Sequence, residues 1–230
     1  EDLTSKMQLT SANSINVARW LPQLLYFIFA YKQLHNTYKN IVFSVPSGNF
    51  GNVCAGMMAQ QLGLPISHFI AANNENNVVT RYLETQLYTP IPSVQTISNA
   101  MDVGAPSNFI RIQEIYKNDF ETLKANISSY SFTDEETKEA LLEIYNTYNY
   151  VADPHGAVGY LGCKAYLKKH PEAHCVFLET AHPTKFLDVV EEVIKEKQSL
   201  PKQIQAVMGK KKISIKIIKY EELKTFLLNS

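Results

Sequence analysis

A short polar segment after residue 45 carries residue types suited to holding an anion. It consists of Ser47, Gly48, Asn49, Phe50, Gly51 and Asn52, between an apolar run at 41–45 and a helical pattern from residue 52. A helix N-terminus offers unpaired N–H groups and the positive end of the helix dipole. Glycines allow unusual backbone geometry and close approach of a ligand, and the Ser and Asn side chains add donors. The segment therefore predicts a phosphate-binding loop. An ordinary strand-to-helix turn is the alternative, since neither a P-loop nor a G-x-G-x-x-G pattern is present.

A second polar segment, 179–183, follows another apolar run at 173–178 and leads into a helical pattern from residue 184. Ligands of open parallel sheets bind outside the carboxyl ends of the strands. If both runs are parallel strands, the two polar segments face one crevice. The alternative is that Thr180 and His182 only cap the following helix. For His155, which lies at another helix start, we also expect a structural role at a cap rather than acid–base catalysis.

The hydrophobic periodicity alternates between strands and helices, which indicates an α/β protein. A strand, a helix and a strand within 41–72 predict a parallel βαβ unit. Pro22 predicts a kink or restart in the helical pattern of 14–35. Residues 88–108 predict a long irregular loop. The remaining predicted elements are strands at 66–72, 173–178 and 213–218, and helices at 52–62, 78–86, 107–118, 119–126, 133–148, 153–167 and 184–197.

Composition limits the function classes. The chain has 230 residues with 22 Lys+Arg and 22 Asp+Glu, so its formal net charge of zero gives no electrostatic footprint for nucleic acid. The longest apolar run, 24–31, is too short to span a bilayer. Three widely spaced cysteines argue against a disulfide framework or a zinc site and favour a reducing compartment. We therefore expect a cytoplasmic protein with no nucleic acid, membrane or metal partner.

Six segments, taken together and in order, resemble the threonine synthase family. They are 11–16 (SANSIN), 45–52 (VPSGNFGN), 69–72 (FIAA), 98–103 (SNAMDV), 153–158 (DPHGAV) and 177–186 (FLETAHPTKF). The family belongs to the tryptophan-synthase-β-like enzymes, which use pyridoxal 5'-phosphate (PLP). The resemblance implies a three-layer α/β fold with a mostly parallel sheet flanked by helices, the large-domain part of a fold type II PLP enzyme.

The resemblance also implies roles for individual residues. Residues 47–52 (Ser47, Gly48, Asn49, Phe50, Gly51 and Asn52) match the loop that binds the phosphate of PLP. Thr180 matches a threonine that faces the pyridine nitrogen, where a hydroxyl in place of a carboxylate leaves that nitrogen largely unprotonated. Ser14 and Asn16 lie in a segment near the family's active site. Asp102 and Asn108, in the long loop, are further candidates for the substrate side.

The chain departs from the family's pattern in one respect. The family's Schiff-base lysine lies in an N-terminal motif, H-G-P-T-x-x-F-K-D, and neither this motif nor the companion S-G-D-T-G-x-A is present. We therefore expect residues 1–230 to be the C-terminal, PLP-phosphate-binding domain of a longer enzyme, with no catalytic residue of its own. Lys164 and Lys185 are expected to be solvated rather than to replace that lysine.

The implied reaction of the intact enzyme converts O-phospho-L-homoserine and water to L-threonine and phosphate. This chain would supply the PLP phosphate loop and Thr180, and its partner would be the missing N-terminal part of the same protein. An oligomer is possible. The alternatives are another PLP-dependent β-family lyase and a stand-alone, non-catalytic α/β module that binds a phosphorylated ligand.

Overall fold

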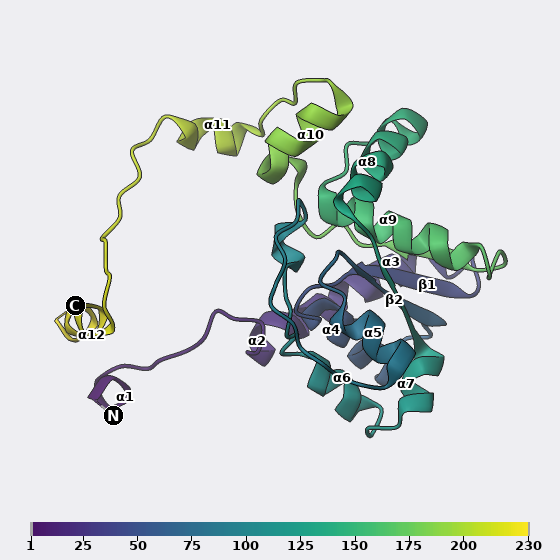
Figure 1. Cartoon of the computed structure of the whole chain (residues 1–230), viewed down its shortest axis with the longest axis horizontal. Helices are drawn as coiled ribbons and strands as arrows, with labels where there is room; N and C mark the ends of the chain where they lie inside the picture. Colours follow the sequence, from purple (N-terminus) through teal and green to yellow (C-terminus); the bar gives the residue numbers. More distant parts are fainter. Residues whose placement is uncertain (1, 230) are drawn as a thin grey trace. The chain divides into compact units, whose positions relative to one another are not determined.

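The computed structural model describes residues 2–229, which form two compact units (Figure 1). The smaller unit joins the two ends of the chain, 2–13 and 199–229. It contains α1 (Asp2–Lys6), α11 (Lys202–Met208) and α12 (Tyr220–Leu228), and α1 contacts α12. The larger unit, 14–198, contains the whole sheet and every candidate site residue.

The sheet of the larger unit is fully parallel. Its strands are β1 (Ile41–Pro46), β2 (His68–Asn73), β3 (Ile127–Ser131) and β4 (His174–Phe177), in the order β3-β2-β1-β4. The chain moves from β1 through β2 to β3 on one side, and then returns to place β4 on the other side of β1. The strand order therefore reverses between β1 and β4, and ligands bind outside the carboxyl ends at such a point.

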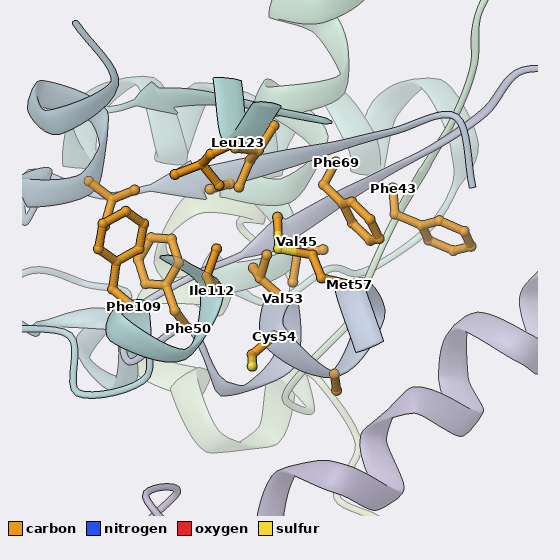
Figure 2. Close-up of a cluster of buried hydrophobic side chains, with 14 of the residues drawn as sticks. Phe43, Val45, Phe50, Val53, Cys54, Met57, Phe69, Phe109, Ile112 and Leu123 are labelled. Carbon is orange, nitrogen blue, oxygen red and sulfur yellow. The ribbon is translucent and has the colours of Figure 1, made fainter. Parts of the chain in front are cut away.

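One face of the sheet is covered by helices from the first half of the unit. They are α3 (Leu24–Leu34), α4 (Gly51–Gln61), α5 (Val78–Thr85), α6 (Phe109–Ile115) and α7 (Phe120–Asn126). Figure 2 shows Phe43, Val45 and Phe69 of the sheet gathered with Val53 and Met57 of α4. At Gly56 of α4 a Cβ would approach the rings of Phe27 and Phe69 within 2.7 Å, so this helix packs close to both rings.

The other face is covered by α9 (Pro154–Leu167), with α8 (Asp134–Tyr148) packed against α9. The Ser44 hydroxyl of β1 donates to the carbonyl of Gly159 at 2.7 Å, which satisfies a polar group inside the sheet. Thr133 and Glu136 form the capping box that begins α8. After β4 the chain forms η3 (Pro183–Phe186) and α10 (Leu187–Ile194). The three layers and the parallel sheet confirm the predicted fold class.

Most predicted elements are present, with three informative differences. Pro22 restarts the first helical pattern as a 3-10 turn, η1 (Leu21–Gln23), between α2 (Val17–Trp20) and α3. The strand β3 was not predicted, because its sequence Ile-Ser-Ser-Tyr-Ser carries few apolar residues. The predicted strand at 213–218 is wrong: residues 211–218 have no regular structure, and no described strand pairs with them. Within the described chain, no helix is both long and apolar enough to cross a membrane.

Candidate functional site

The predicted phosphate-binding loop connects β1 to α4 at the reversal point of the sheet. Residues 47–50 separate the last residue of β1 from Gly51, the first residue of α4. The Ser47 N–H donates to the Ala72 carbonyl of β2 at 2.8 Å, which fixes the start of the loop. Phe50 has a left-handed backbone (φ 62°, ψ 13°) that is uncommon outside glycine. Its ring is buried edge-on to Phe109, so core packing holds the turn in place.

The backbone of this loop is the part that could bind an anion. The N–H groups of residues 48–52 donate to no acceptor among the residues that the structure describes. Five consecutive unpaired donors precede or begin an 11-residue helix, whose dipole adds positive potential at the same place. An unpaired N–H group near the interior costs free energy. A bound phosphate would remove that cost, so the loop fits such a group.

The polar side chains of the loop also make hydrogen bonds within the protein. Ser47 is buried and its hydroxyl donates to the Val45 carbonyl at 2.6 Å. Asn52 donates to the Pro46 carbonyl at 2.8 Å, and its amide oxygen accepts from Val53. Asn49 donates to the Ser14 hydroxyl at 2.6 Å. These hydrogen bonds therefore hold the backbone of the loop in its shape.

The two glycines also act differently from the prediction. Neither Gly48 nor Gly51 has a positive φ. A Cβ on Gly48 would lie 2.6 Å from the Cα of Met101, in the short helix η2 (Asn99–Met101), so this position requires glycine because another backbone packs against it. A Cβ on Gly51 would make only contacts of 3.4 Å or longer, so steric fit permits a larger residue there.

Ser14 and Asn108 were predicted on the substrate side. In the structure they form hydrogen bonds that help to hold the loop in its shape. Asn108 is fully buried and its amide donates to the Ser14 hydroxyl at 3.2 Å and to the Asn49 carbonyl at 3.1 Å. Ser107 donates to the Asn49 amide oxygen from both its N–H and its hydroxyl. Arg111 donates to the Asn108 amide oxygen. These bonds bring three segments far apart in sequence to the same loop.

The hydrogen bonds described for Asn16 and Asp102 do not involve the loop at 47–52. Asn16 caps α2 by accepting from the Ala18 N–H at 3.1 Å. Asp102 accepts from the Asn74 and Asn76 amides at 2.9 and 3.2 Å, and from the N–H and hydroxyl of Thr96 at 3.0 and 2.7 Å. Both carboxylate oxygens of Asp102 are thus used to order the long loop after β2.

A cavity of about 530 Å³ lies at the reversal point and joins the two segments that the sequence singled out. Asn52 contributes one wall, and Thr180 with its neighbours after β4 contributes another. The third wall comes from η1 and α3. The lining residues are Gln23, Tyr26, Phe29, Ala30, Gln33, Asn52, Leu178, Glu179 and Thr180. Its volume lies within the usual range for small-molecule sites.

Two buried residues, Asp153 and His155, and the partly exposed Glu179 form a cluster beside this cavity that was not predicted as a group. Asp153 caps α9 by accepting from the His155 N–H at 2.8 Å, and the same oxygen contacts the His155 ring at 2.6 Å. Hydrogen bonds from His155 and Glu179 outweigh burial, so the pKa of Asp153 lies below its usual range. Burial, reinforced by Asp153, raises the pKa of Glu179 to about 9. The sequence signal was the pair of segments DPHG and LETAHP, but their contact depends on the fold.

The remaining candidates have structural surroundings. Lys164 forms an ion pair with Glu143 at 2.6 Å, and Lys185 is exposed beside the Phe186 ring. None of the described lysines lines the cavity. The ring of His182 accepts from the Thr184 N–H at 3.2 Å and so caps η3, as expected. In the described part of the chain, no group of three or more His, Cys, Asp or Glu residues could hold a metal ion.

Comparison with known proteins explains this arrangement. Residues 14–180 match the family described as pyridoxal-phosphate dependent enzyme, and residues 156–227 match the family described as threonine synthase, C-terminal. The chain belongs to the pyridoxal-phosphate dependent enzymes. The match over 14–180 contains the loop at 47–52, the residues that line the cavity, and Thr180, and this family depends on pyridoxal phosphate.

Curated relatives of this PLP enzyme chain are threonine synthases. The one from Buchnera aphidicola subsp. Acyrthosiphon pisum is 41% identical over 229 residues, which is 98% of this chain and 52% of that relative. The one from Escherichia coli (strain K12) is 40% identical over 89% of this chain and 47% of the relative. The chain therefore spans about half the length of the curated relatives it matches.

Solved structures agree with the sequence comparison. Threonine synthase from Escherichia coli matches with a TM-score of 0.90 at 37% identity, over 100% of this chain and 53% of the other. PLP-bound threonine synthase from Brucella melitensis matches with a TM-score of 0.86 at 28% identity, over 99% of this chain and 55% of the other. A fungal L-serine ammonia-lyase from Rhizomucor miehei, at 13% identity and a TM-score of 0.58, shares the fold alone.

Proposed function

We propose that this chain is the cofactor-binding portion of a threonine synthase, which converts O-phospho-L-homoserine and water to L-threonine and phosphate. The observation that carries the proposal is the identity of about 40% to threonine synthases over nearly the whole chain. The alternative of a different PLP-dependent lyase has weaker support, because the serine ammonia-lyase is far less similar in both sequence and structure.

The anion site supports the choice of cofactor. The unpaired N–H groups of residues 48–52 would hold the phosphate of PLP, with Asn49, Asn108 and Ser14 keeping the loop in shape. Thr180 would offer its hydroxyl to the pyridine nitrogen from the opposite wall of the cavity. When bound, PLP supplies an electron-withdrawing ring that stabilises negative charge at the substrate carbon.

This chain would orient the cofactor rather than react with it covalently. No lysine of the described chain lines the cavity, and Lys164 is held in its ion pair with Glu143. The Schiff-base lysine would therefore come from a segment outside these 230 residues. Tyr26 and Phe29 of α3, both largely exposed in this chain, would offer an apolar contact to one side of the ring.

The test compares the 230-residue chain alone with the same chain after addition of a separately expressed N-terminal portion of a threonine synthase. We expect no release of phosphate from O-phospho-L-homoserine by the chain alone, and measurable threonine formation by the pair. Threonine formation by the rigorously purified chain alone would refute the proposed division of roles. Failure of the pair together with failure of the chain to bind PLP would refute the proposed function.

A further inference from the structure

The carboxyl group of Glu179 lies directly over the first turn of α9. A Cβ built on Gly156 would come within 2.2 Å of Glu179 Oε1 and 2.6 Å of Oε2, so only glycine at this position leaves room for the carboxyl. Glu179 also lines the cavity, beside Thr180. Glu179 therefore connects the loop that carries Thr180 to the N-terminus of a helix on the other side of the sheet.

The partner of this carboxyl is an incompletely satisfied buried acid. Asp153 is fully buried, and its Oδ1 takes both bonds from His155. Its Oδ2 is buried and accepts no hydrogen bond from an N–H group or a hydroxyl of the described residues. The side chain next to it is Glu179, another carboxyl. Two carboxylates in contact would repel each other, whereas one protonated carboxyl can donate to the other.

We propose that Glu179 keeps its proton at neutral pH, donates a hydrogen bond to Asp153 Oδ2, and thereby holds Thr180 in position at the wall of the cavity. Glu179 is a positioning residue, since it acts through Thr180. The hydrogen bond also satisfies an oxygen whose burial would otherwise be costly. The statement that Thr180 then meets the pyridine ring rests on the proposed function, whereas the shared proton and the fixed loop do not.

Other titratable groups near the pair are consistent with one shared proton. The His155 Nδ1 contacts the opposite oxygen of Asp153, and its buried Nε2 has no hydrogen-bond partner within the described chain; the ring packs beside Phe186. Tyr150 lies close to both acids, and burial together with Glu179 and Asp153 raises its pKa, so it stays neutral. The His155 ring contacts only Oδ1 of Asp153, so it favours the ionised form of Asp153 and leaves Oδ2 to Glu179. The other described salt bridges involve neither Asp153 nor Glu179.

The test uses the full chain and three variants. Glu179→Gln keeps a donor to Asp153 and cannot titrate, Glu179→Ala removes the donor, and Glu192→Gln removes an exposed carboxyl on α10 as a matched control. Infrared difference spectra of wild type minus Glu179→Gln at pH 7 should contain the band of a protonated carboxyl, which the difference for Glu192→Gln lacks. A difference that contains only carboxylate bands would overturn the proposal.

The second readout is the backbone order of Thr180 by NMR relaxation. We expect the order parameter to fall from about 0.85 to below about 0.6 in Glu179→Ala and to be retained in Glu179→Gln. Equal order in all variants would contradict the positioning role. The affinity for PLP should weaken about tenfold in Glu179→Ala and change by less than about twofold in Glu179→Gln, as expected for one lost hydrogen bond.

The readouts separate the two proposals. If wild type fails to bind PLP, the proposed function fails, while the infrared band and the order of Thr180 still decide the role of Glu179. If PLP binds equally to wild type and Glu179→Ala, the positioning of Thr180 is refuted and the proposed function stands.

Discussion

Gly48 lies directly against Met101: a Cβ on the glycine would sit 2.6 Å from the Met101 Cα and 3.1 Å from the Ala100 carbonyl oxygen. Backbone cannot move aside as a flexible side chain can. Replacement Gly48→Ala should therefore displace either the phosphate loop or the segment 98–101. We expect a loss of about 1–3 kcal/mol in the free energy of unfolding, measured by urea denaturation, and a weaker affinity for PLP.

Gly51→Ala is the matched control for that substitution. Its Cβ would make only ordinary contacts of 3.4 to 3.5 Å, and its φ is not positive. We expect a change within about 0.5 kcal/mol, because the site is free of the mechanisms that make substitutions costly. Equal destabilisation by both substitutions would show that close packing on Met101 is not what requires glycine at position 48.

Asn108 is expected to control the shape of the phosphate loop without contacting the ligand. Its buried amide joins Ser14 to the Asn49 carbonyl. Asn108→Ala leaves buried polar groups unpaired, so we expect a loss of about 1–3 kcal/mol in the free energy of unfolding. Affinity for inorganic phosphate and for PLP should fall together, as measured by isothermal titration. Asn16→Ala removes a side-chain cap of α2 and keeps the bonds of Asn108 to Ser14 and Asn49, so it should leave both affinities unchanged.

The raised pKa of Glu179 makes stability depend on pH. Its pKa rises from 4.5 in the unfolded chain to about 9 in the folded one, so the folded state binds more protons between these values. The stabilising contribution of Glu179 is thus complete below about pH 4.5 and is lost as pH rises to about 9. Glu179 is partly exposed, so solvent screening reduces this effect. We expect wild type to lose of the order of 1 kcal/mol of stability relative to Glu179→Gln over this pH range. Chemical denaturation from pH 4.5 to 9 would measure it, and parallel stability curves would contradict the assignment.

The three cysteines should differ in reactivity. Burial raises the pKa of Cys54 to about 11, whereas a hydrogen bond from Cys163 lowers the pKa of Cys175. Because the thiolate is the reactive form, Cys175 should be alkylated first by iodoacetamide at pH 8, with Cys54 and Cys163 protected until the chain unfolds. Mass spectrometry of tryptic peptides would follow the order. Faster labelling of Cys54 would mean that α4 is not packed as described.

The sequence predicted the strand, turn and helix around the proposed phosphate loop better than the contacts that the loop residues make. The pattern at 41–52 has a strand, a turn and a helix in one continuous segment, so local physics determined it. The roles of Gly48 and Asn52 could not be predicted, because they depend on Met101 and on the Pro46 carbonyl. Likewise, β3 is held by its pairing with β2 rather than by its own apolar content, whereas the more apolar segment 213–218 lacks such a partner in the described chain.

The central claim is that the unpaired amides of 48–52 hold the phosphate of PLP while no lysine of this chain bonds to it. The most direct test is a titration of the chain with PLP followed by absorbance, then borohydride reduction and peptide mapping. We expect PLP to bind saturably and to be displaced by inorganic phosphate. Borohydride reduction should give no site-specific adduct on a lysine. A single stoichiometric adduct on one lysine, or the absence of phosphate-sensitive binding, would contradict it.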